Sequence, residues 1–434
     1  MNTKYYLAID IGASSGRHIV GWLDGDTIKT EEIYRFYNGV DEVDGHLVWD
    51  IDRLSKSVIE GIKIAFSKYQ IESLAIDTWG VDYVLMNGDT PILPVYAYRD
   101  GRTQNCISKV HKLVSFDTLY CKTGIQFQTF NTIYQLYDDK LQGRLDNATD
   151  FLMIPQYLTW VLTGVKTHEY TECSTGGMVN AQTRKYDEEI ISKLGLPKCL
   201  FGEILQPGTM VGNLKEDVAQ YVGGQTKVVL CASHDTGSAV EGIPMEKDQL
   251  FLSSGTWSLL GACLDNPITT LQSQQQNYAN EGGVGYIRYL KNIMGMWVVN
   301  NLKKELCPDL DFATLIQQAR ENTFNGIVDV NDQKFMAPQS MVQAFDSCFE
   351  SGNKPQTIGD YFKCAFVSLA HCYNKAIKGI SQITNKKYTK LYIVGGGAKN
   401  TYLNELTEQI CGIQVIALPI EATAIGNLKV QMKI

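Results

Sequence analysis

The sequence predicts an α/β fold in two domains, and three observations carry this prediction. The chain has 434 residues, which is too long for a single ordinary hydrophobic core. Apolar runs with the length of buried strands stop at turns of polar and small residues, as Val228–Ala232 stops at Ser233–Gly237. A strand, a small-residue hairpin and a second strand in Leu7–Trp22 recur in outline in Leu250–Cys263. We therefore expect two similar halves with a ligand cleft between them.

The composition is that of a globular protein, with 44% hydrophobic and 20% charged residues. A net charge of −8 argues against a broad surface for nucleic acid or anionic membranes. The eleven cysteines are odd in number and lack C-x-x-C spacing, which predicts neither a disulfide framework nor a zinc site. Reduced thiols, and no visible signal peptide or membrane-spanning run, favour a cytoplasmic protein. The first domain is expected over residues 1–244 and the second over residues 245–434.

The chain begins with a predicted hairpin. Tyr5–Asp10 and His18–Leu23 are expected strands, and the loop between them is rich in small residues. Gly12 and Gly16 can take positive φ there, and the loop's N–H groups and serine hydroxyls could cradle a phosphate. An ordinary glycine-rich turn explains this loop equally well.

The next elements are a strand over Thr27–Phe36, a helix capped by Asp50, and a strand over Ser73–Ile76. The last of these strands runs into Asp77–Asp82, where Gly80 either lets a ligand approach the backbone or simply forms a turn. A charged loop follows at Tyr98–Thr103, and a surface cluster of salt bridges is its commoner explanation.

The remaining elements alternate in the same way. Residues 113–220 are expected to be an insertion of helix and loop that walls the cleft. The later elements, in order, are a helix Pro155–Gly164, a strand Val228–Ala232, a flexible turn Asn280–Gly285, a helix Ile293–Leu302, a helix Thr357–Ile383, strands Leu391–Val394 and Val415–Leu418, and a last helix from Glu421.

Familiar catalytic motifs are absent from the sequence. It has no P-loop, no set of protein-kinase motifs and no dinucleotide fingerprint. Ser233–Asp235 cannot form a hydrolytic triad because three consecutive residues do not converge on one another. Phosphoryl transfer fits better, since it needs phosphate donors, a divalent metal and a base for the attacking hydroxyl. The turns Gly12–Arg17 and Ser253–Thr256, with Asp10 and Asp235, supply these groups, although Asp235 could instead be a helix cap.

Seven short segments follow, in order, the pattern of a known family. Each is weak alone, but together with Asp10 they cover nearly the whole chain, and chance does not explain seven matches in register. On these residues the chain resembles the FGGY family of carbohydrate kinases. The segments are Asp77–Asp82, Tyr98–Thr103, Ala232–Thr236, Ser253–Leu259, Leu290–Gly295, Gly395–Gly397 with Asn400, and Glu421–Asn427.

The resemblance implies two actin-like, ribonuclease H-like ATPase domains flanking a deep cleft that closes on the sugar. It implies phosphorylation of L-rhamnulose at its C1 hydroxyl, with ATP as donor and Mg²⁺ as the metal. The expected partners are the sugar and ATP, without nucleic acid or membrane, and the sequence does not indicate the oligomeric state.

Site residues are carried over by position. Asp235 matches the general base, and the other sugar positions are Gly80, His234, Thr236 and Asn292. Asp10 is expected on the metal side, and Asp82 is the next carboxylate to test as base. The nucleotide positions are Ala13, Ser14, Ser15, Gly16, Arg17, Thr256 and Gly397, with Asn300 standing where the family commonly has glutamine.

Two alternatives stay open at this point. One is a kinase for another ketose such as L-fuculose, and the other is an actin-like ATPase without sugar kinase activity. The chain also ends sooner than the family pattern does. The second domain is therefore expected to be truncated at its C-terminus, with Leu428–Ile434 as a frayed stub.

Overall fold

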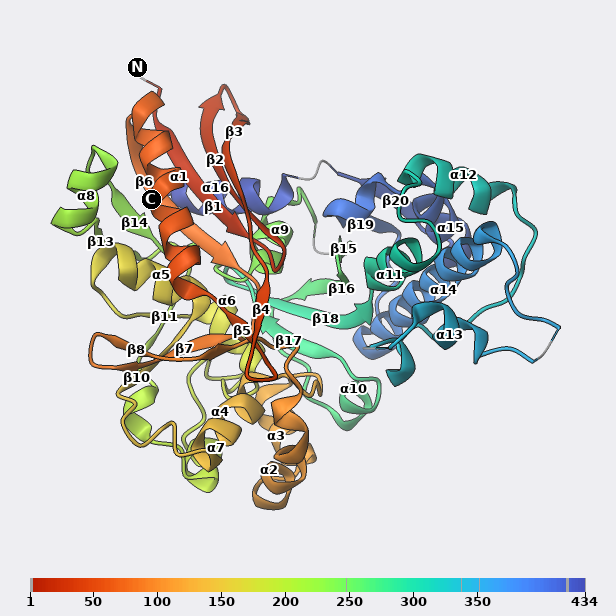
Figure 1. Cartoon of the computed structure of the whole chain (residues 1–434), viewed down its shortest axis with the longest axis horizontal. Helices are drawn as coiled ribbons and strands as arrows, with labels where there is room; N and C mark the ends of the chain where they lie inside the picture. Colours follow the sequence, from red (N-terminus) through yellow and green to blue (C-terminus); the bar gives the residue numbers. More distant parts are fainter. Residues whose placement is uncertain (1–2, 247, 337, 351, 419–420, 434) are drawn as a thin grey trace. The chain divides into compact units, whose positions relative to one another are not determined.

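The structure is a computed structural model that describes residues 3–246, 248–336, 338–350, 352–418 and 421–433 (Figure 1). Its chain folds into two compact units. Unit 1 comprises Met1–Gly242, Leu264–Tyr289 and Glu421–Ile434, and unit 2 comprises Ile243–Cys263 and Leu290–Ile420. Each unit is therefore assembled from segments that are separated in sequence.

Unit 1 is built on a six-stranded mixed sheet in the order β13-β14-β6-β1-β2-β3. β1 lies in the middle because Leu7, Ala8 and Ile9 are fully buried. It pairs antiparallel with β2 and parallel with β6, which gives the predicted N-terminal hairpin. The strands are β1 (Tyr5–Ile11), β2 (Ser15–Asp24), β3 (Thr27–Tyr37), β6 (Ile71–Thr78), β13 (Met210–Asn213) and β14 (Lys227–Val229).

Helix α1 (Ile51–Lys68) packs against this sheet, as its sequence predicts. The Asp50 side chain accepts a hydrogen bond from the Arg53 N–H and so caps the helix. The apolar stripe that includes Leu54, Val58 and Ile62 faces the largest core cluster of the unit. Also within unit 1 are α5 (Ile154–Thr163) and α8 (Glu216–Val222).

Much of the rest of unit 1 forms a second hydrophobic core, which contains the helical insertion expected from the sequence. The charged loop Tyr98–Thr103 is not a surface cluster, so that prediction is wrong. Arg102 is buried and forms ion pairs with Asp138 and Asp139. The elements of unit 1 outside the first sheet, of which β4, β5 and β9 pack on the first core cluster, are β4 (Val40–Val43), β5 (His46–Trp49), β7 (Tyr83–Asn87), β8 (Thr90–Ile92), β9 (Val95–Tyr96), η1 (Gly101–Asn105), α2 (Ile107–Leu113), α3 (Phe116–Thr123), α4 (Thr132–Leu141), β10 (Asp150–Met153), β11 (His168–Glu169), α6 (Tyr170–Cys173), η2 (Ser174–Gly176), α7 (Glu188–Leu194), η3 (Lys198–Leu200), β12 (Ile204–Leu205), α10 (Leu271–Gln275) and β17 (Ala279–Gly282).

The last helix, α16 (Ala422–Met432), belongs to unit 1. Leu428 is fully buried against Ala8 and Ile19 of the first sheet. Gln431 accepts a hydrogen bond from the Ser73 hydroxyl at 2.7 Å. The expectation of a frayed stub is therefore wrong for residues 428–433, while Ile434 lies outside the described residues.

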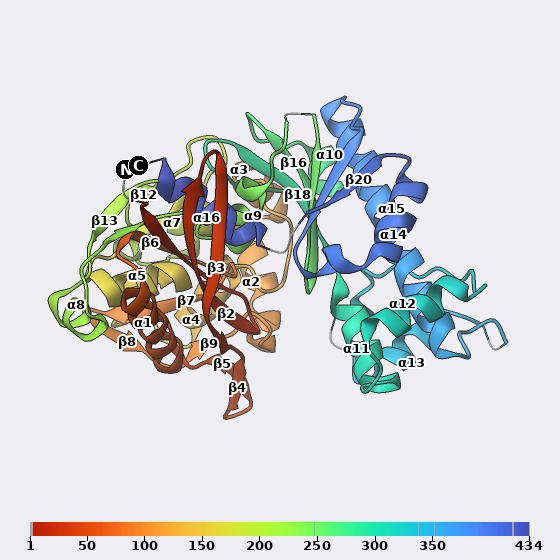
Figure 2. The same ribbon diagram turned by 90° about the horizontal axis from the view of Figure 1, so that it is seen from above.

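Helix α16 also packs closely on α9 (Asp235–Gly242), and both views show the two side by side (Figures 1 and 2). A Cβ atom at Gly426 would overlap the Ser238 carbonyl, and one at Gly242 would overlap the Ala422 carbonyl. Glycine is thus required at both positions for the two backbones to approach one another.

Unit 2 contains strands in the order β18-β16-β15-β19-β20. As in unit 1, its central strand pairs antiparallel with the next strand of a hairpin and parallel with a later strand. The internal repetition that the sequence suggests is therefore present. The elements are β15 (Leu250–Ser254), β16 (Trp257–Leu264), β18 (Ile287–Met294), α11 (Met296–Leu306), α12 (Phe312–Glu321), η4 (Gln333–Phe335), α13 (Met341–Asp346), α14 (Ile358–Thr384), β19 (Lys390–Val394), η5 (Gly396–Lys399), α15 (Thr401–Cys411) and β20 (Gln414–Ala417).

Two predictions near residue 290 are wrong. The expected flexible turn Asn280–Gly285 begins as the buried strand β17. The helix expected to start at Ile293 starts at Met296 instead, because β18 extends to Met294.

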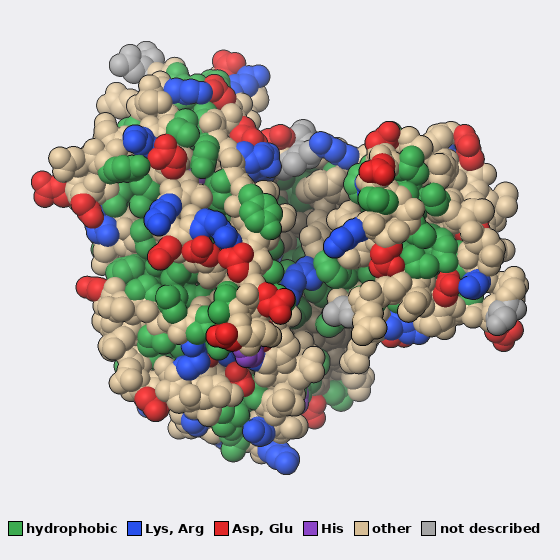
Figure 3. Space-filling model, in the orientation of Figure 1, with side chains coloured by type: hydrophobic (Ala, Val, Ile, Leu, Met, Phe, Trp, Pro, Cys, Tyr) green, Lys and Arg blue, Asp and Glu red, His purple; other side chains and the backbone are tan. Residues whose placement is uncertain are grey.

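Helix length and surface charge are the features on which a membrane or nucleic-acid partner depends. Among the described residues, no helix is long and apolar enough to cross a membrane. On the face shown in Figure 3, Lys and Arg side chains lie among Asp and Glu side chains. All eleven cysteines are free thiols.

Candidate active site

Asp235 is held at the end of the first sheet. The chain that leaves β14 runs beside the end of β6, where the Thr78 N–H donates to the Ser233 carbonyl at 2.8 Å. Thr78 and His234 pair as a parallel bridge, and α9 begins at Asp235. The strand predicted over Val228–Ala232 ends at Val229, but Asp235 still lies at the carboxyl end of a parallel pair, where such sheets present ligands.

The Asp235 carboxylate is held through one of its oxygens. Its Oδ1 accepts hydrogen bonds from the Thr236 N–H and, at 3.1 Å, from the Thr236 hydroxyl. His234 Nε2 lies 3.5 Å from the same oxygen. The side chain keeps 33% of its surface exposed, so Asp235 can be reached by a ligand. Burial of the group raises the pKa of Asp235 above its ordinary value, and the charge of Asp10 adds to this rise.

Asp10 and Asp77 lie on neighbouring strands at the same register. Asp77 is fully buried, and its Oδ2 accepts a hydrogen bond of 2.6 Å from Asn427 of α16. Its Oδ1 has no hydrogen-bond partner among the described residues. Burial, followed by the charge of Asp10, raises the pKa of Asp77 well above its ordinary value. Asp10 and Asp77 therefore form an acidic site at the end of the two strands.

The N-terminal hairpin makes a tight turn, although neither Gly12 nor Gly16 takes positive φ, so the predicted reason for these glycines is wrong. The Gly12 N–H donates to the Ser15 carbonyl at 2.9 Å. Asn38, which the sequence did not single out, donates from Nδ2 to the Gly12 carbonyl at 2.8 Å. Ala13 and Ser14 lie at the tip of this turn, and Ser14 is exposed.

Arg17 lies opposite Asp10 on β2, and its guanidinium forms an ion pair of 2.5 Å with that carboxylate. Arg17 thus balances the charge of Asp10. It lies in β2 directly after the turn that is expected to hold phosphate.

Asp82 is a structural anchor in a fully buried setting. Its Oδ2 accepts hydrogen bonds from the indole N–H groups of Trp49 and Trp79 and from the Tyr98 N–H, at 2.7, 3.0 and 3.0 Å. Its Oδ1 accepts one from Gln135 at 3.1 Å. Four donors leave little capacity to take up a substrate proton, even though burial raises the pKa of Asp82 to about 6.

The loop that carries Gly80 has a strained backbone at the next residue, Val81. Val81 has a φ of 71°, which is costly for a β-branched residue. Its carbonyl is held by the Thr132 hydroxyl at 2.7 Å. A Cβ at Gly80 would lie only 3.2 Å from His234 Nε2, so Gly80 and His234, the two expected sugar positions, are brought together.

A buried glutamate that the sequence did not indicate supports the chain before Asp235. Glu169 accepts hydrogen bonds from the Thr171 N–H and hydroxyl, from the Glu172 N–H, and at 3.3 Å from the Ser233 N–H. The Thr171 hydroxyl in turn accepts one from the His234 N–H at 3.2 Å. Burial raises the pKa of Glu169 to about 7. Nothing in the sequence separates this glutamate from exposed ones.

The remaining candidates lie in unit 2, where Thr256 is part of one turn and Gly397 lies beside it. The Gly255 N–H closes the turn between β15 and β16, and the Trp297 N–H of α11 donates to the Thr256 carbonyl at 3.2 Å. A Cβ at Gly397 would overlap the Ser254 hydroxyl, so glycine is required there. Asn300 is exposed, one helical turn after Met296, and Asn292 is half-buried in β18.

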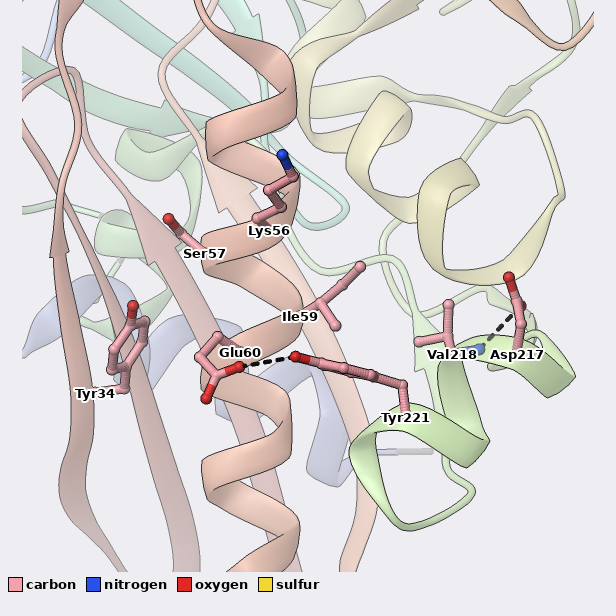
Figure 4. A pocket seen from close by; sticks show the side chains of 8 residues that line it. All are labelled: Tyr34, Lys56, Ser57, Ile59, Glu60, Asp217, Val218 and Tyr221. Atoms are coloured by element: carbon pink, nitrogen blue, oxygen red, sulfur yellow. Dashed lines mark hydrogen bonds between the residues drawn. The ribbon is translucent and has the colours of Figure 1, made fainter.

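A separate pocket of about 570 Å³ lies in unit 1 between α1, β3 and α8 (Figure 4). In it the Tyr221 hydroxyl donates to Glu60 at 3.3 Å. None of the candidate site residues lines this pocket.

Comparison with known proteins assigns the class. The N-terminal domain model of the FGGY family of carbohydrate kinases matches residues 5–242, and the C-terminal domain model matches residues 250–433. The chain therefore belongs to the FGGY family of carbohydrate kinases, and kinases of this family use ATP.

Several curated relatives that the chain resembles over nearly its full length are rhamnulokinases. A rhamnulokinase of Oceanobacillus iheyensis is 42% identical over 433 residues, which cover 98% of this chain and 92% of the relative. A rhamnulokinase of Bacillus subtilis is 40% identical over 436 residues, which cover 98% and 90%.

Solved structures confirm the predicted fold class. A gluconate kinase from Lactobacillus acidophilus gives a TM-score of 0.83 at 16% identity and covers 100% of this chain and 89% of its own. A ligand-bound xylulose kinase from the same organism also gives 0.83, at 17% identity, with coverage of 99% and 89%. At these identities the likeness shows the fold alone.

Proposed function

We propose that this chain phosphorylates L-rhamnulose at its C1 hydroxyl, with ATP as donor, to give L-rhamnulose 1-phosphate and ADP. The similarity to rhamnulokinases over nearly the full length supports this substrate. The observation that carries the chemistry is the setting of the Asp235 carboxylate. One-third of its side-chain surface is exposed, and within the described residues its hydrogen bonds all go to Oδ1, so Oδ2 is open to a substrate.

Asp235 acts as the general base in this proposal. The C1 hydroxyl attacks the γ-phosphorus of ATP, its proton passes to Asp235 Oδ2, and ADP leaves with the electron pair of the broken P–O bond. Because burial raises the pKa of Asp235, this carboxylate holds a proton more firmly than an exposed aspartate does. The rigid backbone before it, fixed through Glu169 and the Thr78–His234 bridge, keeps the base in position.

The other candidate residues divide between the two substrates. Gly80, His234 and Thr236 lie around Asp235 and are proposed to orient the sugar, with Asn292 as a further sugar contact. The first hairpin, with Ala13 to Arg17, offers backbone N–H groups and hydroxyls to the phosphates. Thr256, Asn300 and Gly397 of unit 2 are proposed nucleotide contacts.

Mg²⁺ is the proposed metal, and the acidic site fits it. Asp77 carries a buried carboxylate oxygen without a partner among the described residues, and Asp10 lies at the same register. No group of three acidic, histidine or cysteine residues in the described part of the chain is arranged to hold a metal by itself. Asp10 and Asp77 would therefore share the ion with ATP phosphates, as is usual for Mg²⁺. When bound, the ion neutralises charge on the phosphates.

The proposed setting is the cytoplasm, where ATP is available. Eleven free cysteines are consistent with a reducing compartment. The proposed partners are small molecules only.

An ATP-dependent phosphorylation assay across a panel of acceptors tests the function. The panel contains L-rhamnulose, L-fuculose, D-xylulose, D-gluconate and a control without sugar. We expect the highest kcat/KM with L-rhamnulose and little ATP hydrolysis without an acceptor. A preference for L-fuculose would overturn the substrate but keep the class, whereas ATP hydrolysis indifferent to every sugar would favour an actin-like ATPase.

A further inference from the structure

Arg288 is a fully buried arginine that contacts the imidazole of His234. It lies in the first residues of β18, which belong to unit 1, and none of its surface is exposed. Its Nε donates to the Gly282 carbonyl at 2.6 Å. Its Nη2 lies 3.0 Å from His234 Nδ1 and 3.2 Å from a carboxylate oxygen of Glu281. A buried cation is thus fixed against one nitrogen of a proposed sugar-binding histidine.

This contact decides which nitrogen of His234 carries the proton. A guanidinium stays protonated in proteins and has hydrogen-bond donors but no acceptor. Nδ1 must therefore offer its lone pair to Arg288 at 3.0 Å, since two N–H donors at that distance in a dry site would repel one another. The proton then resides on Nε2, the nitrogen that lies 3.5 Å from Asp235 Oδ1.

Glu281 is the competitor for the same proton. Its Oε2 lies 3.4 Å from His234 Nδ1 and would favour a proton there. That distance is longer than the Arg288 contact, and the same oxygen lies closer to Arg288. Burial raises the pKa of Glu281, but the charge of Arg288 together with the hydrogen bond and charge of His234 lowers it below its ordinary value. Glu281 is therefore an anion that pairs with Arg288 and anchors it.

We infer that Arg288 is a positioning residue that fixes His234 as the neutral Nε2–H tautomer. Nε2 lies 3.5 Å from Asp235 Oδ1 and would lie 3.2 Å from a Cβ at Gly80. Thr236 already donates two hydrogen bonds to Oδ1. In the proposed reaction, on which this part rests, the Nε2–H is therefore a donor to the sugar, and the sugar atom that it meets is an oxygen that accepts a hydrogen bond.

The tautomer can be measured without any substrate. Long-range ¹⁵N–¹H correlation spectra distinguish Nε2–H, Nδ1–H and the doubly protonated ring, and the six histidines of the chain give few signals. The signal of His234 is assigned by its loss in His234→Gln. We expect Nε2–H in the wild-type protein at pH 7.5. An Nδ1–H ring or an imidazolium would overturn the inference.

Variants separate this role from a purely structural one. Arg288→Met removes the donor and should move the proton to Nδ1, where Glu281 accepts it. Arg288→Lys keeps a donor and should keep Nε2–H. The matched control is Arg144→Met, which breaks a hydrogen bond of 2.8 Å to the buried Asp139 elsewhere in unit 1 and should leave the His234 signal unchanged.

Kinetics supply the second readout. Arg288→Met should lower kcat/KM for the sugar about 10-fold, chiefly through a higher KM for the sugar, with the KM for ATP unchanged. An Arg288→Met protein that retains Nε2–H, or one whose sugar KM equals that of Arg144→Met, would overturn the inference. If Arg288→Met does not fold, the wild-type spectrum still decides. A wild-type protein with Nε2–H that does not phosphorylate L-rhamnulose would count against the proposed function and leave the tautomer standing.

Discussion

At the scale of single residues, the carboxyl groups of Asp235 and Asp82 differ in their hydrogen bonds and exposure, and this difference gives them different roles. Both follow strands of the first sheet, and burial raises the pKa of each. Asp82 receives four hydrogen bonds and holds two tryptophans in place. Asp235 is held through one oxygen and is one-third exposed. Only the second arrangement can receive a proton from a substrate.

The buried His18 makes stability depend on pH. It is fully buried and its Nε2 lies 2.9 Å from the Val58 carbonyl. Burial lowers the pKa of His18 to about 4 from an ordinary value of 6.5. Below pH 6.5 the His18 imidazole is therefore protonated in the unfolded chain but stays neutral in the folded chain. The free energy of unfolding consequently falls as the pH is lowered from 6.5 towards 4.

Because of His18 alone, we expect the free energy of unfolding to be about 2 kcal/mol smaller at pH 5 than at pH 7. Denaturant unfolding of the wild type and of His18→Gln at both pH values measures it, and His18→Gln should lose about 2 kcal/mol less. The matched control is His371→Gln, at an exposed position, which should lose as much as the wild type does. Equal losses in the wild type and His18→Gln would contradict the prediction.

At the scale of elements, the sequence is most informative where pattern and burial agree. The stripe of α1 and the hairpin of β1 and β2 are confirmed because their apolar residues face a core at the expected spacing. The segment from 279 to 294 is misread because Glu281 and Arg288 sit inside buried strands as an ion pair. A charged residue in a sequence is expected to be exposed. Glu281 and Arg288 are buried instead because each is the ion-pair partner of the other, and this pairing is seen only in the structure.

The close crossing of α9 and α16 predicts an unusual effect of alanine. Gly426→Ala should improve helix propensity by about 1 kcal/mol, yet its Cβ would overlap the Ser238 carbonyl and push the helices apart. We expect a net loss of about 1–3 kcal/mol in stability. Because α9 begins at Asp235, kcat should fall as well.

Thermal unfolding and steady-state kinetics of Gly426→Ala check this, with Thr423→Ala on the same helix as control. Thr423 is half-buried and should tolerate the change. A Gly426→Ala protein as stable as the wild type would show that the two helices are not packed backbone to backbone.

At the scale of the whole molecule, contacts rather than sequence order decide which unit a segment belongs to. The sequence places α16 next to the elements of unit 2, yet its buried side chains pack on the first sheet. Asn427 of this helix also donates to Asp77, so the last turns of the chain help to build the acidic site. The family motif at Glu421–Asn427 marks these residues, but no sequence pattern says which sheet they contact.

Leu428→Ala tests this assignment. The side chain is fully buried, and such truncations cost about 2–5 kcal/mol. Hydrogen exchange followed by mass spectrometry should become faster in β1, β2 and α9 and stay unchanged in β15, β19 and α14. Leu315→Ala, at a fully buried position of α12 in unit 2, should give the opposite pattern. Faster exchange in β19 and α14 on Leu428→Ala would place α16 with unit 2.

The most direct measurement of the central claim is the single-turnover rate of phosphoryl transfer in Asp235→Asn. The variant keeps the size of the side chain and can still accept the Thr236 hydrogen bonds, but it has lost the proton acceptor. Rapid-quench mixing of enzyme with ATP and L-rhamnulose should show transfer slowed by about 10²–10⁴-fold. The binding of both substrates should change only a few-fold. A transfer rate near that of the wild type would show that Asp235 is not the base.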